Sequence, residues 1–119
     1  MIDKIKDSIY AIKTKIRNFY LGIKSILYWI PIIKNDRWYD YGYLDILIHH
    51  KLKQMEDGFR NNSSNNDAQL IANELKDTSI DMQILISSDE VFPNYSQQYI
   101  DFRKKVYTII GEKSSNWWD

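Results

Sequence analysis

The clearest pattern in the chain is an alternation of apolar residues three and four positions apart over about the first thirty residues. A 3-4 repeat of this kind is typical of a helix that packs along one seam. It predicts a long helix over residues 2–30, which Pro31 ends or kinks, because proline lacks a backbone donor and disfavours helical geometry in the residue before it. We call this set of residues the heptad stripe: Ile2, Ile5, Ile9, Ile12, Ile16, Phe19, Ile23, Ile26 and Ile30.

Three shorter helices follow from apolar residues that recur at helical intervals. We place them at about residues 41–60, 67–87 and 96–113. Asp40 is a candidate N-cap for the first of them and Ser96 for the last. The asparagine- and serine-rich segment 61–66 predicts a loop. Four helices with short connections predict an all-α fold, a single domain over 1–119 arranged as an antiparallel four-helix bundle.

Three features of the later helices leave alternatives open. Thr78 and Ser79 interrupt the apolar stripe of the helix over 67–87. Within residues 80–92, the segment 82–86 is also compatible with a short strand. Gly111 is a possible early end for the last helix.

Charge and composition narrow the classes of function. Sixteen basic and sixteen acidic residues cancel, which argues against a nucleic-acid-binding protein, and the absence of cysteine favours a cytoplasmic location. The charge is uneven, however: residues 1–34 carry seven basic and two acidic groups, and residues 62–98 carry one basic and six acidic groups. Docking of the first helix on the third is therefore favourable, within one chain or between two. The heptad stripe offers an interface for a homo-oligomer.

A membrane span and a signal peptide are not expected. The apolar segment 19–33 is fifteen residues long, shorter than the roughly 20 residues that a spanning helix needs. Acidic residues among the first lysines do not fit a signal peptide.

The chain carries no recognisable catalytic motif. His49 and His50 are adjacent on a helix and point about 100° apart, so that helix cannot present both to one metal ion. Asp45 and His49 share a face, which predicts a surface ion pair and no metal site. Because glycine-rich phosphate loops and nucleophile elbows are absent from the sequence, we expect neither enzymatic activity nor a cofactor.

A segment rich in aromatic and charged residues, 34–43, is the candidate ligand site. An arginine fork binds phosphate or carboxylate, aromatic rings stack on a base, and a carboxylate accepts hydrogen bonds from ribose hydroxyls. The two C-terminal tryptophans need a surface to cover, either the end of the bundle or this pocket. The alternative is that Arg37 pairs with a neighbouring aspartate while the aromatic rings close the end of a bundle. The candidate ligand-binding residues are Lys34, Arg37, Trp38, Tyr39, Asp40, Tyr43, Trp117 and Trp118.

The order of several short motifs resembles a family of small tailed-bacteriophage and prophage proteins. The motifs are Phe19-Tyr20-Leu21-Gly22-Ile23-Lys24, Trp29-Ile30-Pro31, Asp36-Arg37-Trp38-Tyr39-Asp40, the predicted helical segment Leu44–Met55 and the C-terminal Trp117-Trp118-Asp119. The family commonly has Asp-Trp where this chain has Trp38-Tyr39, so one carboxylate is missing here. The resemblance implies a phage origin and names no reaction.

Together these observations favour a phage accessory protein that acts by binding. The leading hypothesis is an anti-defence protein that sequesters a nucleotide-type immune signal in a homo-oligomer. An inhibitor that docks on a host protein through its acidic surface or a helix face is the alternative. Nucleic-acid binding through the basic first helix ranks third.

Overall fold

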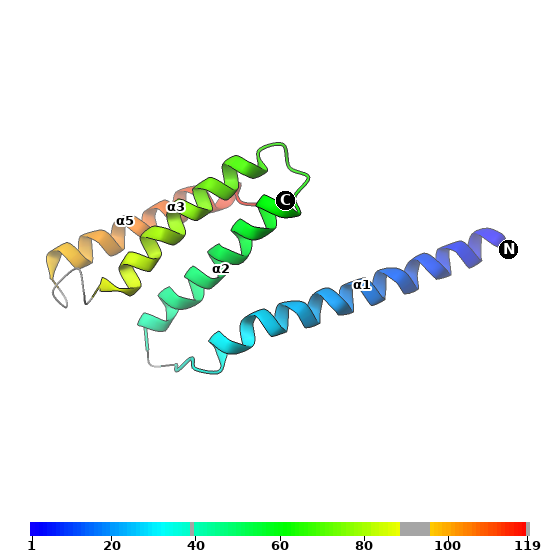
Figure 1. Ribbon diagram of the computed structural model, residues 1–119, viewed down its shortest axis with the longest axis horizontal. Coiled ribbons are helices and arrows are strands. Elements are labelled where there is room, and N and C mark those ends of the chain that lie inside the picture. Colours follow the sequence, from blue (N-terminus) through cyan, green and yellow to red (C-terminus); the bar gives the residue numbers. More distant parts are fainter. Residues whose placement is uncertain (39, 89–95, 119) are drawn as a thin grey trace. The chain divides into compact units, whose positions relative to one another are not determined.

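The structure, a computed structural model, describes residues 1–38, 40–88 and 96–118, and the regular structure in these ranges is helical throughout. The elements are α1 (Ile2–Ile33), α2 (Gly42–Asn61), α3 (Ala68–Ile86), α5 (Gln97–Lys113) and the 3₁₀ helix η1 (Ser114–Asn116) (Figure 1). The predicted all-α class is confirmed, and each α-helix begins and ends within three residues of its predicted bounds. Residues 82–86, which also allowed a strand, are helical, while 89–92 lie outside the described residues.

The chain divides into two compact units, Met1–Asp36 and Arg37–Asp119. The first unit is α1 with a short tail, and α1 contributes no buried residue. The second unit contains α2, α3, α5 and η1, and it holds the hydrophobic core. Within the described residues, the core of the second unit consists of side chains from α2, α3 and α5, with Ala68 at the start of α3 and Trp117 after η1.

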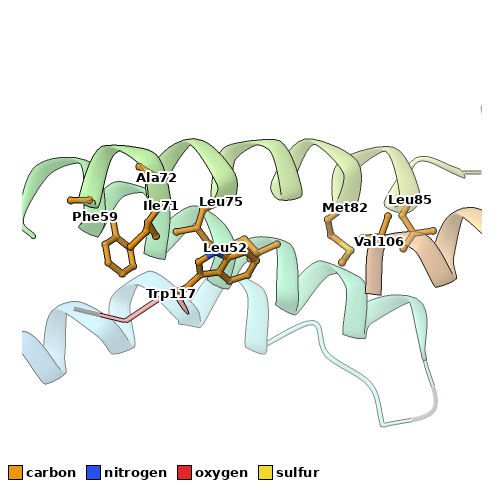
Figure 2. Packing of buried hydrophobic residues seen from close by; sticks show 10 residues of the cluster. Leu52, Phe59, Ile71, Ala72, Leu75, Met82, Leu85, Val106 and Trp117 are labelled. Atoms are coloured by element: carbon orange, nitrogen blue, oxygen red, sulfur yellow. The ribbon is translucent and has the colours of Figure 1, made fainter. Parts of the chain in front are cut away.

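The core of the second unit runs along α3, which lies between the other elements in sequence and supplies most of the buried side chains. Leu75 and Met82 have no exposed surface at all. Burial of one such side chain stabilises the fold by roughly 1.5–3 kcal/mol. Figure 2 shows this row of side chains. Its labelled members are Leu52, Phe59, Ile71, Ala72, Leu75, Met82, Leu85, Val106 and Trp117.

The polar pair on α3 does not interrupt its buried face, contrary to the sequence-based expectation. Thr78 and Ser79 are 3% and 2% exposed. Their hydroxyls donate hydrogen bonds of 2.8 Å to the backbone carbonyls of Glu74 and Lys76. A hydroxyl satisfied by its own helix can be buried at little cost, so both residues pack as small side chains.

The predicted N-cap Ser96 is confirmed, whereas the predicted N-cap Asp40 is wrong, because the N-cap of α2 is Tyr41. The Ser96 hydroxyl accepts a 3.2 Å hydrogen bond from the backbone N–H of Tyr99 at the start of α5. The Asp40 carboxylate accepts from the backbone N–H of Gly42 at 3.0 Å, although the residue directly before α2 is Tyr41. Gly111 does not end α5, which continues to Lys113.

Pro31 does not end α1, and the predicted end near residue 30 is wrong. The helix runs on to Ile33, and the backbone N–H of Lys34 still donates to the carbonyl of Ile30 at 3.1 Å. Proline removes the donor that would reach the carbonyl of Leu27. The Leu27 side chain is exposed, so water can reach this turn and replace the missing partner.

Candidate functional site

The carboxylate of Asp45 on α2 is a buried charge that is bonded to two side chains of α5. Only 3% of Asp45 is exposed. One carboxylate oxygen, Oδ2, accepts a 2.6 Å hydrogen bond from Nη1 of Arg103, and the other, Oδ1, accepts a short hydrogen bond from the Tyr107 hydroxyl. Both donors come from α5, so this cluster fastens α5 to α2. We call Asp45, Arg103 and Tyr107 the Asp45 cluster.

Aromatic rings surround the guanidinium of the Asp45 cluster. The Arg103 Cζ atom lies 5.4 Å from the ring centre of Tyr41 and 4.9 Å from that of Tyr107, which is cation–π geometry. Arg103 Nη1 also donates to the Tyr99 hydroxyl at 3.4 Å. Burial lowers the pKa of Arg103, but the hydrogen bond and charge of Asp45 outweigh it and raise the pKa above its ordinary value. Arg103 therefore stays a cation at every physiological pH.

The Tyr107 hydroxyl is held in its neutral form. Burial raises its pKa, and the hydrogen bond to Asp45 and the charge of that carboxylate raise it further, against the opposing effect of Arg103. Tyr107 is thus a hydrogen-bond donor and not a base. Among the described residues, every buried side-chain nitrogen and oxygen has a hydrogen-bond partner. The geometry of the Asp45 cluster is that of a structural clamp.

The predicted surface pair between Asp45 and His49 is wrong, because Asp45 is buried and is held by residues of α5. Burial lowers the pKa of His49, and the charges of Lys53 and His50 lower it further. His49 therefore stays largely neutral near pH 7. Across the described ranges, no three His, Cys, Asp or Glu side chains are grouped so as to hold a metal ion.

A cleft of about 210 Å³ lies beside the Asp45 cluster, where the start of α2 meets the end of α3 and the start of α5. Asp40 and Ser88 contribute polar groups to its lining, and Leu85 and Ile86 contribute apolar side chains. The phenol rings of Tyr41 and Tyr99 also line it. The carboxylates of Asp40 and Asp45 line this space and no basic side chain among the described residues does, so the cleft favours hydroxyl or amino groups of a ligand over phosphate.

The structure brings together only part of the predicted ligand site. Asp40 lines the cleft, Tyr43 is half-buried in the first turn of α2, and Arg37 and Trp38 are exposed, with Trp38 at 96%. Lys34 belongs to the first unit. Tyr39 lies outside the described residues.

The two C-terminal tryptophans lie at the other end of the second unit. Trp117 is 6% exposed, and its indole N–H donates to Oε2 of Glu74 at 3.2 Å. The backbone carbonyl of Trp118 accepts from Asn65, in the loop after α2, at 3.3 Å. Because a twenty-residue helix such as α2 is about 30 Å long, neither tryptophan reaches the cleft at its start. Trp117 completes the core, as Figure 2 shows, and does not close a ligand pocket within one chain.

Trp118 lines a second, shallow cleft of about 340 Å³ at that end, together with Asn65, Asp67 and Glu74. Its indole is 70% exposed. The sequence-based prediction that both tryptophans dock is thus met by Trp117, whereas Trp118 only borders a groove.

The Asp45 cluster was missed in the sequence, although two signals point to it. Asp45 lies four residues after Tyr41 and three before Ile48, inside the apolar face of α2, where an unpaired charge is costly. Tyr99, Arg103 and Tyr107 are spaced four apart on one face of α5. A charge in one apolar face and an opposite charge in another are candidates for a buried pair.

Neither a membrane-spanning helix among the described residues nor a similar known protein was found. No helix in the described part of the chain has the length and hydrophobicity to cross a membrane. Searches with protein-family models, among curated proteins and among solved structures each find no match.

Proposed function

We propose that the chain is a non-enzymatic binding protein of a tailed phage or prophage, and that it engages its partner through the heptad stripe of α1. One observation carries the proposal. All nine residues of the stripe are exposed, from 41% at Ile23 to 70% at Phe19, and α1 contributes no buried residue.

Exposed apolar residues in a continuous row are unfavourable in water unless a partner covers them. The core of the second unit consists of residues from α2, α3 and α5 together with Trp117. A binding role also agrees with the Asp45 cluster, because its donors and acceptors are bonded to one another inside the bundle. The phage origin is supported by the motif order around Tyr20–Lys24 and at the C-terminus.

Site-specific photo-crosslinking in producing cells tests this proposal. We replace Phe19 on the stripe, or Tyr10 on another face of the same helix, with a benzophenone amino acid. Both are aromatic and well exposed, at 70% and 74%, so they form a matched pair. We expect a discrete covalent protein product from position 19 and little from position 10. Equal yields, or no product from either position, would refute binding through the heptad stripe.

A second candidate function is the binding of a nucleotide-type ligand at the cleft beside Asp40. The observation in its favour is the combination of a carboxylate edge with the rings of Tyr41 and Tyr99. The cleft volume of about 210 Å³ is below the roughly 300–1,000 Å³ of most ligand pockets, so it suits a base or sugar rather than a whole dinucleotide. Arg37 is the nearest predicted phosphate ligand in sequence.

Thermal shift with a panel of linear and cyclic nucleotides tests this second function. A ligand at about 100 times its dissociation constant adds ~2.7 kcal/mol, which raises the Tm of a domain of this size by about 10 °C or more. We expect the shift to disappear in Arg37→Ala while the Tm of the unliganded protein stays unchanged. A flat panel with well-folded protein contradicts sequestration of the ligands tested.

A further inference from the structure

We infer that the partner of α1 is the chain itself, and that three α1 helices associate side by side as a parallel coiled coil. This inference rests on the proposed function of the heptad stripe and adds the identity, number and direction of the partners.

The heptad stripe has a strict period. Its nine residues keep a strict 3-4 spacing over four repeats, and Ile33 continues it by one more position. A straight α-helix drifts by about 20° per heptad against this repeat, so only a supercoiled helical partner keeps all ten side chains at one seam. A flat membrane surface favours a broad apolar face with a period of 3.6 and gives no reason for a strict 3.5 repeat.

The residue types in the heptad stripe favour more than two helices. In heptad terms Ile2 stands at position a and Ile5 at position d. Every a and d position up to Ile33 is then isoleucine except Phe19, and isoleucine at both positions shifts the preference from two strands to three or four. Three identical helices in equivalent positions around one axis must all run in the same direction, which makes the coil parallel.

A hollow of about 380 Å³ lies on the surface of α1 and at its C-terminal end. Its lining residues are Ser25, Ile26, Trp29, Ile30, Ile33 and Lys34. Four of these, at 26, 29, 30 and 33, are spaced i, i+3, i+4 and i+7, the diamond into which a side chain of a neighbouring helix inserts in a coiled coil. Pro31 stands at position b, off the seam, so it does not disturb this layer.

The flanking positions are compatible with a parallel arrangement. A residue at g faces the e residue five positions later on the neighbouring helix. In α1 this pairing places Lys15 opposite Tyr20 and Trp29 opposite Lys34, and no such pair joins two like charges. Lysine and aromatic side chains attract each other through cation–π contacts.

Light scattering on the full chain after size-exclusion chromatography tests the inference. The chain has a mass of 14.3 kDa, so three copies give about 43 kDa. We expect this mass for the wild type and a fall to that of one chain in Ile9→Lys/Ile16→Lys, which places charges at two a positions. Both residues are exposed within the single chain, so the second unit should unfold at an unchanged urea concentration.

Tyr10→Lys/Leu21→Lys is the matched control, because it adds the same charges at exposed positions off the seam. It should keep the mass of three chains. A wild-type mass of one or two chains, or a trimer that survives Ile9→Lys/Ile16→Lys, overturns the inference. If the wild type is monomeric and position 19 still crosslinks to another protein, the proposed function stands and self-association fails. If the monomer instead sediments with anionic phosphatidylglycerol vesicles, the stripe is a membrane-surface helix and the inference also fails.

A conservative variant tests the number of strands separately. Leucine at d with isoleucine at a favours two strands. Replacing the five d residues, Ile5, Ile12, Phe19, Ile26 and Ile33, with leucine should therefore lower the mass from that of three chains to that of two. An unchanged trimer in this variant would show that the a and d residues do not set the number of chains.

Discussion

Removing the charge of Asp45 should loosen α5 from α2, and the structure allows the size of the effect to be worked out. In Asp45→Asn the side chain keeps its shape but loses the negative charge that faces Arg103 Nη1 at 2.6 Å. It also offers one oxygen instead of two, so it cannot accept from both Arg103 and Tyr107 as the carboxylate does.

Two charge-assisted hydrogen bonds are worth about 1.5–3 kcal/mol each. With 3% of Asp45 exposed, water cannot replace the lost partner there. The side chain of Arg103, however, is 24% exposed and regains part of its hydration. After this discount we expect Asp45→Asn to lower the free energy of unfolding by about 3 kcal/mol. Tyr107→Phe removes only the hydroxyl and should cost about 1.5 kcal/mol.

Urea unfolding followed by tryptophan fluorescence measures these changes, because Trp117 is buried in the core of the same unit. The double variant Asp45→Asn/Tyr107→Phe closes a mutant cycle. Since both changes remove the same hydrogen bond, the double variant should cost about 1–2 kcal/mol less than the sum of the single ones. Additive losses, or a cost below about 0.5 kcal/mol for Asp45→Asn, would refute the clamp.

Three further predictions concern other parts of the chain. The pKa of His49 is lower in the folded than in the unfolded state, so the unfolded chain binds more protons as the pH falls below the ordinary value of 6.5. Stability is then lost as the pH falls through the ordinary value of 6.5, and the urea midpoint should show a weaker loss in His49→Gln. Trp117→Phe gives up the hydrogen bond to Glu74 and leaves a cavity, so the free energy of unfolding should fall by about 1–2 kcal/mol in urea, whereas Trp118→Phe should change it little. Pro31→Ala restores a backbone donor inside α1 and should increase helicity measured by circular dichroism without changing the unfolding of the second unit; unchanged helicity would mean that the last turn of α1 gains nothing from the donor.

Hydrophobic periodicity was enough to locate the helices, because each helix gathers its apolar residues on one face. In α2, α3 and α5 that face is buried in the core, and in α1 it is exposed. The apolar positions of α2, α3 and α5 recur at helical spacing, and their predicted bounds lie close to the observed ones. Predictions from single residue types failed where water or a backbone carbonyl of the same helix supplied the missing hydrogen-bond partner. Pro31 was expected to end or kink α1, but the helix continues to Ile33, because the exposed last turn tolerates the lost donor. Thr78 and Ser79 were expected to interrupt α3, but each hydroxyl bonds to a carbonyl of its own helix.

The polar site was harder to predict, because its partners are distant in the sequence. Asp45 is 58 residues from Arg103 and 62 from Tyr107, and a local reading paired it with His49 instead. Residue type alone suggested that the C-terminal tryptophans could close the pocket predicted at residues 34–43. The length of α2 separates Asp40 from Trp117, and a spacing pattern does not show which end of a bundle the chain returns to.

The chain separations within the second unit also set an order of folding. Helices α2 and α3 are joined by six residues, 62–67, and pack more extensively with each other than with any other element. Closing so short a loop loses little chain entropy, so this hairpin should form early, whereas α5 must close a much longer loop before Arg103 reaches Asp45. The last element to dock is the first to open when its contacts are few. Amide hydrogens of α5 should therefore exchange with solvent through a partial opening that leaves the α2–α3 hairpin protected.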